Sequence, residues 1–238
     1  MNHGTPLLSE LLKRLAKIEG IEWIRMLYLY PKHFSDELLE TIMTEPKVCK
    51  YIDMPLQHIN NTVLQRMNRK DTRENIVALL HKIRNRSEHI TLRTSLIVGF
   101  PGETEEQFQE LADFVKDIRF DHMGVFTYSQ EDGTPAGVMD EQIPEEVKEE
   151  RYHTLMAIQA QVSEEHNRDL EGTIHQGLIE AIDEVEPGKF LARGRLQMQA
   201  PDVDGNMYVE DVTGLSEGDI VTVKVSQGFA YDVVVETV

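Results

Sequence analysis

The stretch Tyr51-Ile-Asp-Met-Pro-Leu-Gln-His58 constrains the fold more than any other part of this 238-residue chain. It begins as a short strand-forming run, and Pro55 ends the strand because proline cannot donate a ladder hydrogen bond. A helix is then predicted from Asn61. Three polar side chains crowd the end of the strand: Asp53, Gln57 and His58. The order of strand, polar tip and helix is typical of the edge of an α/β barrel on which an active site forms.

Hydrophobic periodicity extends this pattern over the first 170 residues. It predicts strands at 22–29, 50–54, 90–98 and 121–127. Helices are predicted at 6–18, 35–45, 61–67, 71–86, 105–118 and 144–170. The predicted helix caps are Ser35, Asp71 with Glu74, and Thr104 with Gln107. Strands that alternate with helices predict a parallel α/β sheet, hence a partial, TIM-like barrel.

The chain opens on a helix that no strand precedes. Strand 22–29 would then be an uncovered apolar edge, which proteins normally avoid. We therefore expect that barrel strands are missing on the N-terminal side. We also expect the isolated chain to be prone to aggregation.

The pattern changes at Glu171 to short alternating runs separated by turn residues. Strands are predicted at 173–182, 189–196, 206–209, 220–227 and 230–236. Five short strands in so few residues predict a small antiparallel barrel. The expected organisation is therefore two domains, 1–170 and 171–238.

Charge and cysteine content limit the partners of this chain. Its formal net charge is −18, and residues 171–238 contain 13 acidic against 4 basic side chains. RNA is therefore an unlikely partner and a basic protein a better one, although acidity alone also confers solubility. The single cysteine, Cys49, forms no internal disulfide, which fits a reducing cytoplasm. No apolar run is long enough for a membrane span.

Several polar residues near the predicted strand ends are candidate ligand contacts. The loop Gly99-Phe-Pro-Gly-Glu-Thr104 joins a strand to a capped helix and offers free backbone N–H groups, although it also fits a simple turn. Arg66 and Arg69 suit a carboxylate, or they are solvated. Arg93 lies on a strand that should be buried beside Ser95, so a carboxylate partner from protein or ligand is expected. Taken alone, His58 is more often a structural residue.

Five segments together resemble the radical S-adenosylmethionine methylthiotransferases. They are Trp23–Pro31, Asp53–His58, Leu64–Arg69, Arg93–Thr104 and Gly124–Ser129, and they occur in the family's order. The resemblance extends over essentially the whole chain. It implies that residues 171–238 are a TRAM domain following an incomplete radical SAM barrel.

The resemblance also implies cofactors. Such enzymes bind S-adenosylmethionine (SAM) and 4Fe-4S clusters, and three cysteines spaced CxxxCxxC hold the cluster that cleaves SAM reductively. This chain has no cysteines at that spacing and so resembles a C-terminal fragment without the iron–sulfur ligands; no metal ligand is predicted. The residues expected near SAM or substrate are Pro55, Gln57, His58, Arg66, Arg69, Arg93, Ser95, Gly99, Gly102 and Glu103.

The segment Asp53–His58 is most similar to the branch that methylthiolates an aspartate of ribosomal protein S twelve. The expected function is therefore transfer of a methylthio group to a basic small-subunit ribosomal protein, recognised through the acidic TRAM domain and completed by the missing N-terminal part. Two alternatives remain open. One is a tRNA methylthiotransferase of the same family, and the other is a non-catalytic remnant that only binds a partner.

Overall fold

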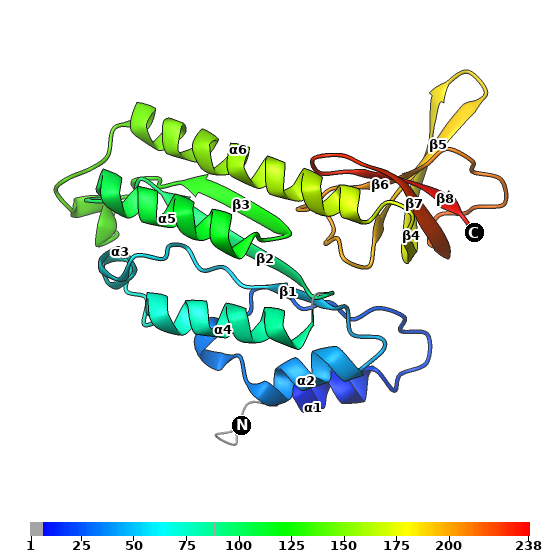
Figure 1. Cartoon of the computed structure of the whole chain (residues 1–238), viewed down its shortest axis with the longest axis horizontal. Helices are drawn as coiled ribbons and strands as arrows, with labels where there is room; N and C mark the ends of the chain where they lie inside the picture. The colour runs from blue at the N-terminus through cyan, green and yellow to red at the C-terminus, as the bar shows by residue number, and fades with distance from the viewer. Residues whose placement is uncertain (1–6, 88) are drawn as a thin grey trace.

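A three-stranded parallel sheet forms the centre of the first 170 residues in the computed structural model, which describes residues 7–87 and 89–238. Its strands are β1 (Tyr51–Asp53), β2 (Thr91–Val98) and β3 (His122–Thr127), in that spatial order. The register places Arg93 between Asp53 of β1 and His122 of β3. The predicted partial α/β barrel is confirmed (Figure 1).

Helices connect and cover these strands. They are α1 (Leu8–Leu15), α2 (Asp36–Thr44), α3 (Asn61–Arg66), α4 (Arg73–Arg86), α5 (Glu105–Ile118) and α6 (Glu145–Asp169), with short 3-10 turns η1 (Pro31–His33) and η2 (Ala136–Val138). Ser35 and Thr104 are N-caps as predicted, and Thr104 forms a full capping box with Gln107. The predicted Asp71 cap is wrong, because the Thr72 hydroxyl accepts the Asn75 N–H instead. Within the described residues, no helix is long and apolar enough to cross a membrane.

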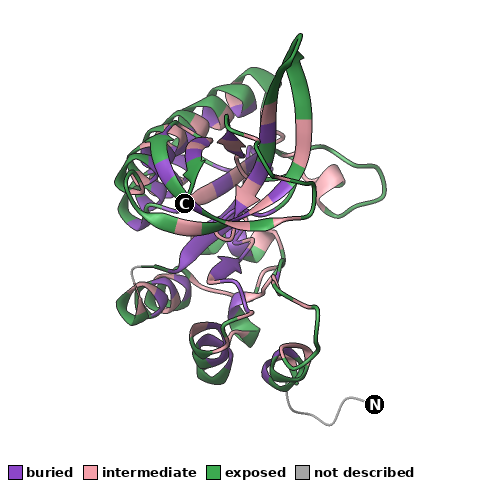
Figure 2. Ribbon diagram, turned by 90° about the vertical axis from the view of Figure 1, so that its right-hand side faces the viewer, coloured by how far each residue is buried: buried purple, intermediate pink, exposed green. Residues whose placement is uncertain are grey.

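The two faces of the sheet differ in polarity. One face packs Ile52, Leu92, Leu96 and Val125 against the helices in one apolar core. The opposite face, here called the polar face, is formed by Tyr51, Asp53, Arg93, Ser95, His122 and Gly124. Figure 2 shows buried residues concentrated on the strands and on the helix sides turned toward them. Because the polar face is also largely buried, its charged groups need partners.

The prediction of a regular strand over 22–29 is wrong. The segment runs beside β1, but it forms only one bridge, between Ile24 and Val48, and one further main-chain bond from Leu29 N–H to Asp53. Tyr28 has φ +59°, in the left-handed region, and this conformation interrupts an extended strand.

We expected the outer side of this segment to be an uncovered edge. In the structure, the beginning of the segment is covered. Arg25 donates to the carbonyl of Gln197, and the Arg195 guanidinium lies 5.6 Å from the centre of the Trp23 ring. The second half of the chain therefore covers the beginning of the segment. The expected tendency to aggregate stays a prediction.

The second half of the chain is a closed barrel with strand order β4-β5-β6-β8-β7. The predicted small barrel is confirmed, but it is not wholly antiparallel, because β6 and β8 pair in parallel. The strands are β4 (Ile174–Glu186), β5 (Lys189–Leu196), β6 (Met207–Val209), β7 (Ile220–Gly228) and β8 (Val233–Thr237). Its core is separate from that of the sheet and consists largely of valine, with Ile179 and Met207. The β4–β5 hairpin extends well beyond the barrel body (Figure 1).

We predict that Thr104→Ala lowers the unfolding free energy by about 1 kcal/mol, because it removes the cap that begins α5. Denaturant unfolding measures the change. Thr44→Ala is the matched control, since that hydroxyl bonds only to the carbonyl of Glu40 in the last turn of α2. An equal effect of both substitutions would contradict the capping role.

Candidate functional site

The carboxyl edge of the sheet holds most of the candidate residues. After Asp53 the chain makes a bulge and rejoins β2, because Gln57 N–H donates to Ser95 and Ile97 N–H donates to Gln57. Gln57 adopts φ +72°, an unusual conformation for a residue other than glycine. Both Pro55 and Gln57 remain partly exposed, so they are accessible to a ligand at this edge.

His58 and Glu103 lie beneath this edge, in a closed cluster with Arg151 of α6. The side chains of His58 and Glu103 are both 0% exposed, and His58 Nε2 lies 3.9 Å from Glu103 Oε2. Arg151 Nη1 donates to Glu103 Oε1 at 3.0 Å. Glu103 Oε2 also accepts the N–H groups of Gly99 and Phe100, so this carboxylate fixes the glycine-rich loop from inside.

The electrostatics of the cluster follow from its burial. Burial and the nearby Arg151 charge lower the pKa of His58 to about 3, so the imidazole is neutral. Its Nδ1 accepts the N–H of Asn60, which places the ring proton on Nε2. Burial also raises the pKa of Glu103, against the opposing effects of Arg151 and the two loop N–H groups.

Gly99 and Gly102 of the loop leave space for the side chains of Lys148 and Arg66. A Cβ on Gly99 would lie 2.3 Å from Lys148 Cγ, and one on Gly102 would lie 2.0 Å from Arg66 Nη1. Both glycines also have φ +74°. Lys148 is buried, and its ammonium donates to the carbonyl of Tyr128 just after β3. The loop is thus packed under α6 and beside α3.

The two arginines near α3 differ in their surroundings. Arg66 is partly exposed and pairs with the exposed Glu141 at 3.1 Å. Arg69 donates to the carbonyl of Pro55 and lies against the Tyr30 ring, whereas its buried Nε has no hydrogen-bond acceptor among the described residues. Arg69 thus has a buried donor without an acceptor near the carboxyl edge.

Arg93 and Ser95 lie on the polar face rather than at its carboxyl edge. Arg93 Nη1 donates to Asp53 Oδ1 at 3.0 Å and lies 3.3 Å from the Ser95 hydroxyl oxygen. Its Nε is 3.3 Å from Asp204, a residue of the second domain. The carboxylate partners that the sequence required for Arg93 are therefore supplied by the protein.

Sequence analysis missed three buried charged residues: Lys148, Arg151 and Asp204. Lys148 and Arg151 lie on the same face of α6 as the buried Leu155, and charged residues on an apolar helix face were a usable signal. Asp204 gave no such signal, because it lies in an acidic loop that looks solvated in the sequence.

The described residues contain no group of three or more His, Cys, Asp or Glu side chains able to hold a metal ion. Cys49 is 1% exposed and packs with Tyr51 and Ala200, and burial raises the pKa of its thiol. An iron–sulfur cluster requires several thiolates, so the residues of this chain do not fit one.

Comparisons with known proteins agree with this arrangement. Residues 3–115 match the Radical SAM superfamily model, and residues 172–238 match the TRAM domain model. A ribosomal protein uS12 methylthiotransferase RimO of Clostridium botulinum (strain Loch Maree / Type A3) is 47% identical over 232 residues, which cover 98% of this chain and 51% of that protein. RimO of Geobacter sulfurreducens is also 47% identical, over 99% of this chain and 52% of its own length.

The chain is similar to the radical SAM methylthiotransferases. It is RimO-like, and it spans about half the length of the curated relatives it matches. Coproporphyrinogen III oxidase (HemN) from Escherichia coli, a radical SAM enzyme, superposes with a TM-score of 0.51 at 23% identity over 65% of this chain and 36% of its own. That likeness concerns the fold alone, and it agrees with the partial barrel.

The buried His58 predicts a specific pH dependence of stability. Its pKa is about 3 when folded and about 6.5 when unfolded, so the unfolded state binds the additional proton between these values. The unfolding free energy should therefore fall by about 1 kcal/mol between pH 6.5 and 5.5, a slope that steepens toward about 1.4 kcal/mol per pH unit at lower pH. Denaturant unfolding at pH 7.5, 6.5 and 5.5 measures this slope.

His58→Asn is the comparison, because an asparagine oxygen can replace Nδ1 as the acceptor of the Asn60 N–H. Subtracting the two slopes cancels the contributions of His166 and His175, whose pKa values burial also lowers. Equal slopes for the two proteins would contradict the neutral buried imidazole.

Proposed function

We propose that this chain forms the edge that binds SAM and the TRAM domain of an enzyme that methylthiolates an aspartate of ribosomal protein uS12. The observation that carries the proposal is the 47% identity to uS12 methylthiotransferases over 98% of the chain. The reaction would take place in the cytoplasm, where ribosomes are assembled.

In this proposal SAM binds along the carboxyl edge of the sheet. The partly exposed Arg69 guanidinium is the candidate for the carboxylate of SAM, and the partly exposed Pro55 and Gln57 border the same place. Ser95, on the polar face, would contact the ligand from the interior, while Arg66 would close the outer rim. When reduced by one electron from the cluster of a complete enzyme, bound SAM would supply a radical able to abstract hydrogen.

The remaining predicted residues would support the edge. His58 and Glu103 hold the loop from below, while Gly99 and Gly102 allow Lys148 and Arg66 to pack against it. Arg93 fixes Asp53 within the polar face. The thiolates for the cluster would come from outside these 238 residues, because Cys49 is alone and buried.

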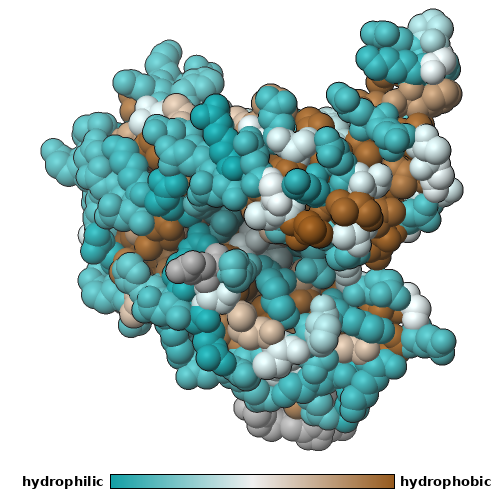
Figure 3. Space-filling model, turned by 45° about the vertical axis from the view of Figure 1, so that its right-hand side comes forward, coloured by the Kyte–Doolittle hydropathy of each residue, from teal (hydrophilic) through white to brown (hydrophobic). Residues whose placement is uncertain are grey.

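The TRAM domain is proposed to recognise the basic uS12 protein through its charge. Much of the face in Figure 3 is hydrophilic, with apolar patches between the polar groups. The projecting β4–β5 hairpin has exposed acids at its tip, among them Asp183 and Glu186, next to the exposed Val185 and Phe190. A projecting acidic hairpin with apolar side chains suits a basic protein surface.

The test is binding of purified uS12 to the chain, measured by calorimetry at increasing salt concentration. We expect Asp183→Asn combined with Glu186→Gln to weaken binding several-fold at low salt, with the difference shrinking as salt screens the charges. Glu149→Gln with Glu150→Gln on exposed positions of α6 is the control with the same change in charge.

Three results would contradict this proposal: no binding, salt-independent binding, or equal weakening by both double variants. A tighter, salt-sensitive complex with tRNA would instead support a tRNA-modifying member of the family.

A further inference from the structure

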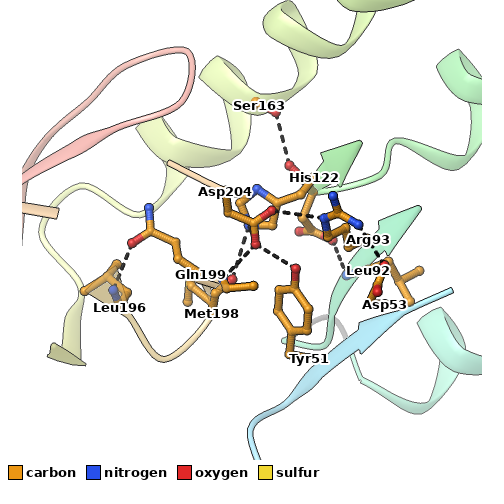
Figure 4. Close-up of polar contacts among 12 residues, drawn as sticks. Tyr51, Asp53, Leu92, Arg93, His122, Ser163, Leu196, Met198, Gln199 and Asp204 are labelled. Atoms are coloured by element: carbon orange, nitrogen blue, oxygen red, sulfur yellow. Dashed lines mark hydrogen bonds and ion pairs between the residues drawn. The ribbon is translucent and has the colours of Figure 1, made fainter. Parts of the chain in front are cut away.

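One loop of the TRAM domain inserts a carboxylate into the polar face of the sheet. Asp204 lies between β5 and β6, and its side chain is 1% exposed. Its Oδ2 accepts the Tyr51 hydroxyl at 2.6 Å and the Ala200 N–H at 2.8 Å. Its Oδ1 lies 3.3 Å from Arg93 Nε (Figure 4).

The contact continues from Asp204 across the sheet. Arg93 Nη1 donates to Asp53 Oδ1 at 3.0 Å, and Asp53 Oδ2 accepts the backbone N–H of Tyr28 at 2.9 Å. Tyr28, Asp53, Arg93 and Asp204, from four separate parts of the chain, thus form one chain of polar contacts, here called the relay. Although burial alone lowers the pKa of Arg93, the hydrogen bond and charge of Asp53, with Asp204, raise it overall, so the guanidinium stays charged.

The relay ends at a strained residue. Tyr28 has φ +59°, a conformation that costs a residue with a Cβ about 1–2 kcal/mol, and its side chain is 76% exposed. Neither burial of the Tyr28 ring nor a regular strand holds it in this conformation. Strain of this kind persists only where the surroundings fix it, and the Asp53 carboxylate is the group that holds this N–H.

We propose that Asp204 is a positioning residue. From the TRAM domain its carboxylate holds Arg93, Arg93 holds Asp53, and Asp53 fixes the strained backbone of Tyr28. The position of the TRAM domain and the conformation of the segment beside β1 are then coupled. The inference goes beyond the proposed function, which assigns no part to Asp204 or Tyr28.

The test is residue-resolved amide hydrogen exchange of the whole chain with Asp204→Asn. This change keeps the size of the side chain and removes its charge, so Arg93 loses one of its two carboxylates. We expect the Tyr28 amide to exchange roughly tenfold faster or more, because breaking a buried ion pair is strongly destabilising. The Leu29 amide, which bonds to the main-chain oxygen of Asp53, should change much less.

Asp202→Asn is the matched control, since Asp202 is exposed on the same loop and loses the same charge. If Asp204 had only a local anchoring role, its substitution would speed exchange only in residues 197–206 and the residues they cover. Unchanged exchange at Tyr28 would overturn the proposal. If the Asp204→Asn variant does not fold, hydrogen exchange of the unmutated chain still tests the proposal. A Tyr28 amide that exchanges at the unprotected rate in the unmutated chain would overturn the relay.

Discussion

The buried guanidinium of Arg93 is the interaction on which the arrangement of the two domains depends. A charged group with so little access to solvent is stable only when carboxylates and hydrogen bonds replace its hydration. Asp53 supplies one carboxylate from the neighbouring strand, and Asp204 supplies the other from the TRAM domain. The polar face of the sheet is therefore complete only with the TRAM loop in place. The same domain also contacts Arg25 through Gln197 of that loop and Trp23 through Arg195 of β5.

Sequence patterns predicted most of this fold because the decisive signals are local. The apolar periodicity of α5 and α6, the Thr104 cap and the alternating strands of the second domain all appear where expected. The segment 22–29 misled the analysis, because its apolar residues are as strand-like as those of β2. What breaks the strand is the left-handed backbone at Tyr28, and that depends on a carboxylate 25 residues away in sequence.

The candidate site was less predictable than the fold. Motif residues pointed to one edge of the sheet, but they could not separate residues exposed at that edge from those that build the loop. His58 and Glu103 lie closed beneath the edge because the cation that pairs with Glu103, Arg151, comes from a helix 48 residues further along. Asp204 was unpredictable for the same reason, since a buried acid and a solvated acid look alike until the tertiary contacts are known.

These observations lead to one central claim: the chain contains a partial radical SAM barrel and a TRAM domain but not the thiolates for an iron–sulfur cluster. Anaerobic reconstitution of the purified chain with iron and sulfide tests it most directly, with iron, labile-sulfide and visible-absorption analysis and with Cys49→Ser as the control. The account predicts no stoichiometric cluster and identical spectra for the two proteins. A stoichiometric 4Fe-4S cluster on the unmutated chain, lost in Cys49→Ser, would contradict it.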